Sequence, residues 1–272
     1  MEFEIFSLSN GIQVIHQRKA GDAAHFGLFV DVGSRDELDN ETGLAHMLEH
    51  CMFKGTTNRK AFHILNRLDN IGGELNAYTT KEETSIHSSF LKQYYERAIE
   101  LTFDIAFNPT FPEKEVAREK LIILDEFYAY RENPSDQIFE DFDQIVFPNH
   151  SLGRTILGEP KHIKKAKRKD LATFHSDYYH PDNMVLASVG DVSTSQLKKW
   201  LEKLKVTILK VVLRDKSFFS DVNHPARKML NKLAKLASED KGENSRLENV
   251  LDRFIDRVVA EYDNDELVVE RV

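Results

Sequence analysis

The sequence lacks the features that define several large classes of protein. It contains one cysteine, Cys51, in 272 residues, so no disulfide forms within the chain and a reducing, cytoplasmic location is expected. No apolar run approaches the roughly 20 residues that a membrane-spanning helix needs. The N-terminus, MEFEIFSLSNG, has no signal-peptide pattern. With only 12 Gly and 7 Pro, collagen-like and low-complexity structures are excluded.

An excess of positive charge is also missing. The chain has 37 Lys and Arg against 45 Asp and Glu, which gives a net charge of −8. Because phosphate binding needs clustered positive charge, a nucleic-acid partner is not expected. The lack of a long apolar run likewise means that no membrane partner is expected. The hydrophobic fraction of 41% is that of a globular protein. The length allows one large domain or two modest ones.

Patterns of apolar and turn residues predict an α+β fold, because hairpin signals and helical stretches occupy separate parts of the chain. The sequence favours Asp39, Asn40 or Thr42 as the N-cap of the first helix. The expected strands cover residues 2–8, 12–16, 25–32, 74–80, 83–91 and 185–189. The expected helices cover residues 43–53, 60–71, 93–107, 112–131, 135–147 and 193–204.

The pattern changes after residue 205. Residues 206–213 are interpreted as a strand, and residues 225–236 and 245–262 as amphipathic helices. We therefore expect one domain over residues 1–205 and a short, mostly helical tail over residues 206–272.

The stretch HMLEH at 46–50 is the sharpest chemical signal. On a helix, His46 and His50 lie one turn apart on one face and can present two imidazoles to one metal ion, with Glu49 beside them. The order H-x-x-E-H is a known zinc-peptidase signature. On these residues alone, however, two histidines on an exposed helix next to a chance glutamate fit equally well.

A third ligand decides between these interpretations. Glu119 and Glu126 lie seven residues apart on the expected helix 112–131, so both can point toward one site. The alternative is that they belong to the solvated face of an acidic helix.

Taken together, several blocks carry a specific resemblance. The block HMLEHCMFKGT at 46–56 resembles the zinc-site helix of the pitrilysin/insulinase family of metallopeptidases. Further blocks occur in the family's order and spacing over nearly all of residues 1–205. They are GSRDE at 33–37, GGELNAYTTKEET at 72–84, ILDEF at 123–127, ENP at 132–134, FPNHSLGRTILG at 147–158 and YYHPDNMVLASVGDV at 178–192.

This resemblance implies both a fold and a site. The implied fold is a mainly antiparallel sheet with helices packed on one face. The implied site holds one zinc ion per chain through His46, His50 and Glu126, with Glu49 as the general base and Glu119 as an acidic group next to the site.

The resemblance also implies how a peptide binds. Residues 75–78 are expected to form a sheet edge, where Asn76 and Ala77 contact an extended peptide substrate by β-augmentation. The other residues of 75–78 are interpreted as part of an ordinary strand after the Gly72-Gly73 turn, with no role in substrate binding. Cys51 adjoins a ligand but is expected to point off the ligand face, as a small buried apolar residue.

The chain departs from the family in one respect. Family members carry a second, homologous half, and residues 206–272 are too short for it; HPARKMLNKLA at 224–234 instead resembles a helical bacterial domain of unknown function. A second half, a partner subunit or a homo-oligomer is therefore expected. Two functions stand: a zinc endopeptidase acting on short or unfolded peptides, or a zinc-binding but non-hydrolytic subunit that binds peptides or regulates a partner.

Overall fold

A computed structural model describes residues 3–212. The chain divides into two units, Met1–Val211 and Val212–Val272, and the first is described here by itself. The expected helices at 225–236 and 245–262 lie outside the described residues. The domain boundary expected at residue 205 stays a prediction.

Six strands form one sheet in the order β1-β2-β6-β3-β5-β4. Every neighbouring pair is antiparallel except β2 and β6, which run parallel. β4 therefore ends the sheet, and its outer edge pairs with no strand in residues 3–212. The strands are β1 (Glu4–Ser7), β2 (Gln13–Arg18), β3 (Ala23–Val30), β4 (Glu74–Thr79), β5 (Thr84–Leu91) and β6 (Met184–Gly190).

Alternation along the central strands directs one set of side chains into the core. In β3, Phe26, Leu28 and Val30 are buried, whereas His25 and Phe29 on the other face are more exposed. A strand directs successive side chains to opposite faces, so this period of two determines which face receives the helices.

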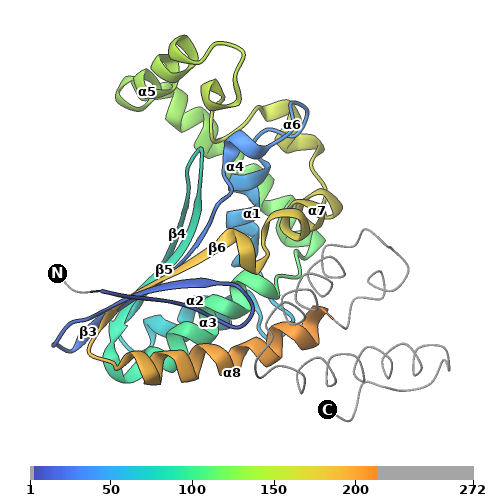
Figure 1. Ribbon diagram of the computed structural model, residues 1–272. Helices are drawn as coiled ribbons and strands as arrows, with labels where there is room; N and C mark the ends of the chain where they lie inside the picture. The colour runs from blue at the N-terminus through green and yellow to red at the C-terminus, as the bar shows by residue number, and fades with distance from the viewer. Residues whose placement is uncertain (1–2, 213–272) are drawn as a thin grey trace, which may run out of the picture. The chain divides into compact units, whose positions relative to one another are not determined.

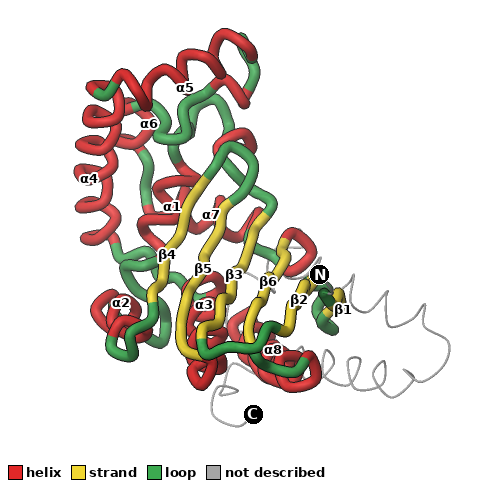
Figure 2. Tube along the Cα trace, turned by 90° about the vertical axis from the view of Figure 1, so that its left-hand side faces the viewer, coloured by secondary structure: helices red, strands yellow, loops and turns green. Residues whose placement is uncertain are grey.

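Helices cover that buried face (Figures 1 and 2). Met47 and Leu48 of α1, Ile99 of α3 and Leu171 of α7 are fully buried in the same core. The helices of this layer and its rim are α1 (Leu44–Met52), α2 (Ala61–Asp69), α3 (Tyr95–Phe107), α6 (Pro160–Lys165), α7 (Arg168–Tyr178) and α8 (Thr194–Val212).

Two further helices, α4 (Glu113–Glu132) and α5 (Pro134–Val146), meet at Asn133. α5 lies beyond one end of β4 and β5, away from the layer of helices (Figure 1). None of its residues is buried. Phe139, Phe142 and Ile145 are 69%, 62% and 78% exposed. α5 therefore exposes a contiguous apolar face, whereas the apolar residues on an ordinary protein surface are scattered singly.

The fold confirms the predicted α+β class, the N-terminal hairpin, the mainly antiparallel sheet and the helices on one face. The strand expected at 206–213 is wrong, because α8 runs without a break to Val212. Its apolar residues fit a helix as well as a strand, an ambiguity that short apolar runs carry. Helices α6 and α7 were not expected from the sequence. Within residues 3–212, no helix combines the length and hydropathy needed to cross a bilayer.

The N-terminus of α1 corrects another prediction. None of Asp39, Asn40 and Thr42 caps this helix. Glu37 does so instead: its Oε2 accepts a hydrogen bond from Gly43 N at 2.9 Å and its Oε1 accepts one from Ala45 N at 2.7 Å. A carboxylate six residues upstream thus satisfies two backbone donors that the helix itself leaves free.

Glycine is required where the chain enters α1. Gly43 has a φ of +88°, in the left-handed region that side chains disfavour. A Cβ there would also lie 2.7 Å from the carbonyl oxygen of Leu157. The TILG block at 155–158 therefore packs directly against the start of the helix that carries His46 and His50.

We expect Glu37→Ala to lower the free energy of unfolding by about 2–4 kcal/mol, because two buried N–H groups lose their acceptor. Burial raises the pKa of Glu37 from 4.5 to about 8. The folded protein therefore holds a proton that the unfolded chain releases. The contribution of this protonation to the free energy of unfolding is complete below about pH 4.5 and is lost as the pH rises through about 8.

Denaturant unfolding in chelator at pH 5, 6, 7 and 8 checks both expectations. The parent should lose more stability over this range than Glu37→Ala. Glu132→Ala, at an exposed position, serves as the control and should match the parent. Equal pH slopes for the parent and Glu37→Ala would contradict the prediction.

Candidate metal centre

α1 presents the H-x-x-E-H motif next to the core. Most of this helix is buried, and His46 itself is only 8% exposed. The His46 and His50 rings lie 4.6 Å apart between centroids, as expected for residues one turn apart. Tight packing on the sheet thus fixes the backbone from which both imidazoles project.

α4 supplies two carboxylates with different surroundings. Glu119 is buried, in the same stripe as Val116 and Ile123. Glu126, two turns further on, has a side chain that is 43% exposed. The two residues share one side of the helix, as predicted, but only Glu126 faces both histidines.

Three donor atoms converge where α1 and α4 meet. Glu126 Oε2 lies 3.6 Å from His50 Nε2 and 3.9 Å from His46 Nε2. The ligand atoms of His46, His50 and Glu126 all lie within 4.8 Å of one another. These separations are too long for hydrogen bonds. In a tetrahedral zinc site, neighbouring ligand atoms lie about 3.4 Å apart, so a small contraction around an ion suffices. The donor set fits zinc.

The second nitrogen of His50 is held from behind. His50 Nδ1 lies 3.1 Å from Glu119 Oε2, and Lys54 Nζ lies 3.0 Å from Glu119 Oε1. Donation from Nδ1–H to Glu119 leaves the lone pair of Nε2 directed at Glu126. A carboxylate behind a histidine ligand fixes its tautomer and orientation in this way. Glu119 therefore contacts His50 rather than the point of convergence.

His46 carries the protonation state that metal binding needs. Burial, together with the neighbouring His50, lowers the pKa of His46 to about 3, so its imidazole is neutral at physiological pH. Cys51 is fully buried, as predicted, and burial raises the pKa of its thiol to about 12. The thiol stays protonated and takes no part in the donor set. The cytoplasmic location expected from this single cysteine stays a prediction.

Glu49 lies beside the three donors without joining them. Its Oε2 accepts a hydrogen bond from Thr79 Oγ1 at 2.6 Å. Burial raises the pKa of Glu49, and the Thr79 hydrogen bond and His50 partly oppose the rise. A carboxylate with a raised pKa close to a metal site is suited to accepting a proton and passing it on.

The two residues expected to contact substrate lie on the edge strand, as the sequence predicted for residues 75–78, but on different faces. Ala77 shares the half-buried face of β4 with Thr79. Asn76 is exposed on the other face, and its Nδ2 donates to Glu74 Oε1 at 2.9 Å. The structure therefore brings Ala77 to the side of Glu49 and turns the Asn76 side chain away. Their role in substrate binding stays a prediction.

Sequence reasoning missed two polar contacts of this site. Thr79 contacts Glu49, and Lys54 contacts Glu119. Thr79 falls within the GGELNAYTTKEET block but no spacing connects it to Glu49, 30 residues earlier. Lys54 lies one turn past His50, so the i, i+4 spacing is the one signal that points to it.

Comparison with known proteins gives two family matches. Residues 13–160 match the family model described as Insulinase (Peptidase family M16). Residues 189–265 match the second domain of a protein of unknown function, DUF1631. The first match contains every candidate site residue, and most of the second lies outside the described residues.

Similar proteins include peptidases from mitochondria and bacteria. The beta subunit of the mitochondrial-processing peptidase of Rattus norvegicus is 35% identical over 196 residues, which cover 72% of this chain and 40% of the rat protein. An uncharacterized zinc protease of Rickettsia bellii is 36% identical over 203 residues, covering 74% of this chain and 49% of that protein.

A solved structure agrees. The crystal structure of a protease from Helicobacter pylori superimposes with a TM-score of 0.71 at 28% identity, covering 74% of this chain and 49% of that one. The chain thus spans 40–49% of the length of these three proteins.

Proposed function

The chain belongs to the insulinase family, peptidase family M16, and from this premise we propose that it is the catalytic half of a zinc-dependent endopeptidase acting on short or unfolded peptides. The observation that carries the proposal is the convergence of His46, His50 and Glu126 beside the carboxylate of Glu49. The zinc proteases among its relatives support the choice of metal.

His46, His50 and Glu126 would hold one zinc ion. When bound, zinc lowers the pKa of a coordinated water and polarises a substrate carbonyl. The Glu119 carboxylate keeps the His50 ring oriented. The neutral His46 needs no deprotonation before it binds the ion.

Glu49 moves the proton. Its Oε2 is engaged by Thr79, so Oε1 is the oxygen available to accept a proton from the attacking water. The same carboxyl then delivers that proton to the leaving amine. A pKa raised by burial suits both steps, because the group must hold the proton between them.

The peptide would lie along β4. Its outer edge pairs with no strand in residues 3–212, and an extended peptide can add to such an edge by main-chain hydrogen bonds. The side chains of Ala77 and Thr79 lie on the face of β4 next to α1, where Thr79 contacts Glu49. A peptide paired with the outer edge of β4 would therefore pass close to Glu49. Asn76 would contribute its backbone, since its side chain faces away.

Full activity is proposed to need a second half, as a partner subunit or a further copy. The chain spans 40% of the length of the rat protein and 49% of the Rickettsia bellii protein, and α5 leaves a large apolar face exposed. Without an opposing wall the site is wet, which weakens electrostatic stabilisation of the developing oxyanion.

We therefore expect monomeric chain to cleave peptides about 100-fold or more slowly than the assembled enzyme, since loss of one oxyanion donor alone costs that much. The measurement is cleavage of a fluorogenic peptide by chain shown to be monomeric by sedimentation. It is repeated after adding a polypeptide equivalent to the unmatched part of the Rickettsia bellii protease. Full turnover by the monomer would contradict the need for a second half.

A chelator distinguishes the two candidate functions. Cleavage that o-phenanthroline stops and zinc restores supports the endopeptidase. Zinc and peptide binding without cleavage in any assembly supports the non-hydrolytic subunit. The short length of the chain relative to its relatives is the observation that favours this second function. The retained base, Glu49, favours the endopeptidase, because a subunit without catalysis has no chemical need for it.

A further inference from the structure

We propose that Thr79 is a positioning residue for Glu49, and that the β4–β5 turn is built to hold its hydroxyl in place. The inference rests on the proposed function, since it assigns a role at the same site. It goes beyond the metal ligands and the base to a contact made from a different part of the fold.

The contact is short and well directed. Thr79 Oγ1 donates to Glu49 Oε2 at 2.6 Å, the distance of a strong hydrogen bond to an ionised acceptor. It is also the one side-chain hydrogen bond described for Glu49 within residues 3–212. Hydrogen bonding at one oxygen restrains the torsions of the carboxylate and leaves the other oxygen free toward the site.

The turn after Thr79 is fastened to the loop that follows β3. Backbone hydrogen bonds run from Ser34 N to Thr80 O at 3.1 Å and from Arg35 N to Lys81 O at 2.9 Å. A Cβ on Gly33 would lie 2.4 Å from the carbonyl carbon of Lys81. The two loops therefore touch through bare backbone, which only glycine allows.

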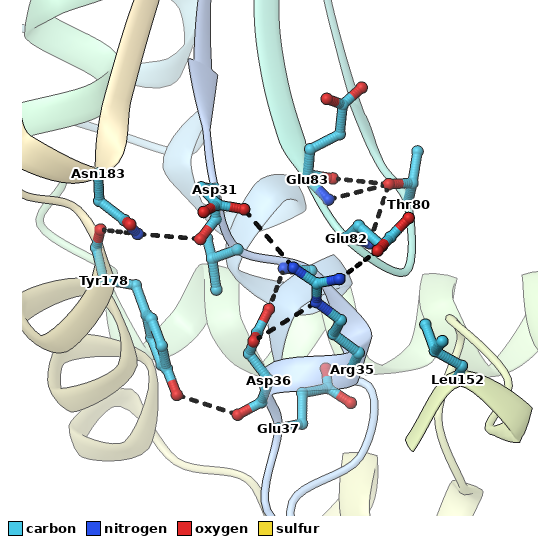
Figure 3. Close-up of polar contacts among 12 residues, drawn as sticks. Asp31, Arg35, Asp36, Glu37, Thr80, Glu82, Glu83, Leu152, Tyr178 and Asn183 are labelled. Carbon is cyan, nitrogen blue, oxygen red and sulfur yellow. Dashed lines mark hydrogen bonds and ion pairs between the residues drawn. The ribbon is translucent and has the colours of Figure 1, made fainter. Parts of the chain in front are cut away.

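Side chains strengthen the same junction (Figure 3). The Arg35 guanidinium pairs with Glu82 in the turn and also lies near Asp31 and Asp36. Thr80 Oγ1 accepts hydrogen bonds from the backbone N–H groups of Glu82 and Glu83. The turn is thus closed on itself and tied to its neighbour, close to Thr79.

On its other side the turn is tied to α5. Lys81 Nζ lies 2.5 Å from Asp143 Oδ2 and donates to Leu152 O at 2.9 Å. The Lys81 side chain is only 15% exposed, so solvent screens this contact less than it screens a surface pair. Fastened from two directions, the turn has little freedom to carry Thr79 away from Glu49.

The physical consequence is orientation. A general base must lie within hydrogen-bond reach of the proton that it abstracts, and a free glutamate side chain samples several rotamers. The Thr79 hydroxyl selects one of them. Groups that orient metal ligands from behind contribute about 10–100-fold to metal affinity or activity, and an effect of about 10-fold is expected for the group that orients Glu49.

The test compares Thr79→Val, which keeps the shape and loses the hydroxyl, with Thr79→Ser, which keeps the hydroxyl. The full chain is loaded with zinc, and peptide hydrolysis is measured in whichever assembly the parent is active. We expect Thr79→Val to lower kcat about 10-fold, with KM and zinc content within twofold of the parent. Thr79→Ser should restore most of kcat.

Thr194→Val is the matched control. Thr194 Oγ1 donates to Glu4 Oε1 at 2.7 Å on the exposed surface. Thr194→Val therefore loses the same kind of hydrogen bond, from threonine to glutamate, far from the site. Its kcat should equal that of the parent. A loss shared by Thr79→Val and Thr194→Val, or no rescue by Thr79→Ser, would overturn the inference.

A second measurement does not depend on turnover. In protein labelled with ¹³C at glutamate carboxyls, the Glu49 resonance is the one missing from Glu49→Gln. We expect Thr79→Val to shift it and Thr79→Ser to leave it in place; an unshifted resonance in Thr79→Val would overturn the inference. If the parent fails to hydrolyse any peptide, the proposed function fails, and this resonance alone decides the role of Thr79.

Discussion

Glu49→Gln should abolish peptide hydrolysis while the protein keeps its zinc. The amide has the size of the carboxyl and still accepts a hydrogen bond from Thr79, but it cannot take a proton from water at neutral pH. General-base catalysis contributes about 10²–10⁴-fold. Because Glu49 also returns the proton to the leaving amine, we expect a loss of kcat near the upper end of that range.

Single-turnover cleavage of a fluorogenic peptide, with zinc measured on the same sample, checks this expectation. Glu132→Gln makes the same chemical change at the exposed end of α4 and should behave like the parent. Residual turnover above a tenth of the parent's rate would remove Glu49 from the role of base. Loss of zinc in Glu49→Gln would mean that this residue helps to hold the ion.

Removal of a ligand should have an equally large effect on metal binding. Loss of an outer contact costs about 10–100-fold in metal affinity, so His46→Ala or Glu126→Ala should cost more than about 100-fold. Glu119→Gln removes only the group behind His50 and should fall within the 10–100-fold range. The expected result is therefore a graded series, with the parent tightest and the ligand variants weakest.

Competition with a chromophoric chelator measures these affinities, and circular dichroism verifies that each variant is folded. His63→Ala, at an exposed histidine on α2, is the matched control and should bind zinc like the parent. Equal affinities for Glu119→Gln and Glu126→Ala would contradict the distinction between the outer carboxylate and the ligand. Tight binding by both His46→Ala and Glu126→Ala would overturn the ligand assignment.

The sequence predicted the parts of this site that depend on local geometry. His46 and His50 are four residues apart, so both rings lie on one face as soon as their segment is helical. The core strands and most helices followed from periodicity for the same reason. Where two periods fit equally well, as at 206–212, periodicity alone could not decide between strand and helix.

Contacts between distant segments were harder to predict. Nothing in the residues alone distinguishes Glu119 from Glu126, because both carboxylates lie on one side of α4, and the resemblance to a family was needed to assign them. The structure separates them by burial and distance. Thr79 and Glu37 likewise make their hydrogen bonds to residues in other segments of the chain, and no short sequence pattern predicts such contacts. Glu37 caps α1 although three N-cap candidates lie closer to the helix in the sequence.

In the nascent chain, the two histidines emerge long before the sheet on which they rest is complete. Of the strands in residues 3–212, β6 is synthesised last, yet it lies between β2 and β3 and pairs with both. Translation at about 5–20 residues per second needs about 7–28 s for the 140 residues from Cys51 to Gly190. Until then β2 and β3 expose unpaired edges, which invite pairing with other chains. The sheet that supports His46 and His50 is therefore complete only after Gly190 has been synthesised, and a chain stalled before that residue exposes the edges of β2 and β3 to chaperones and proteases.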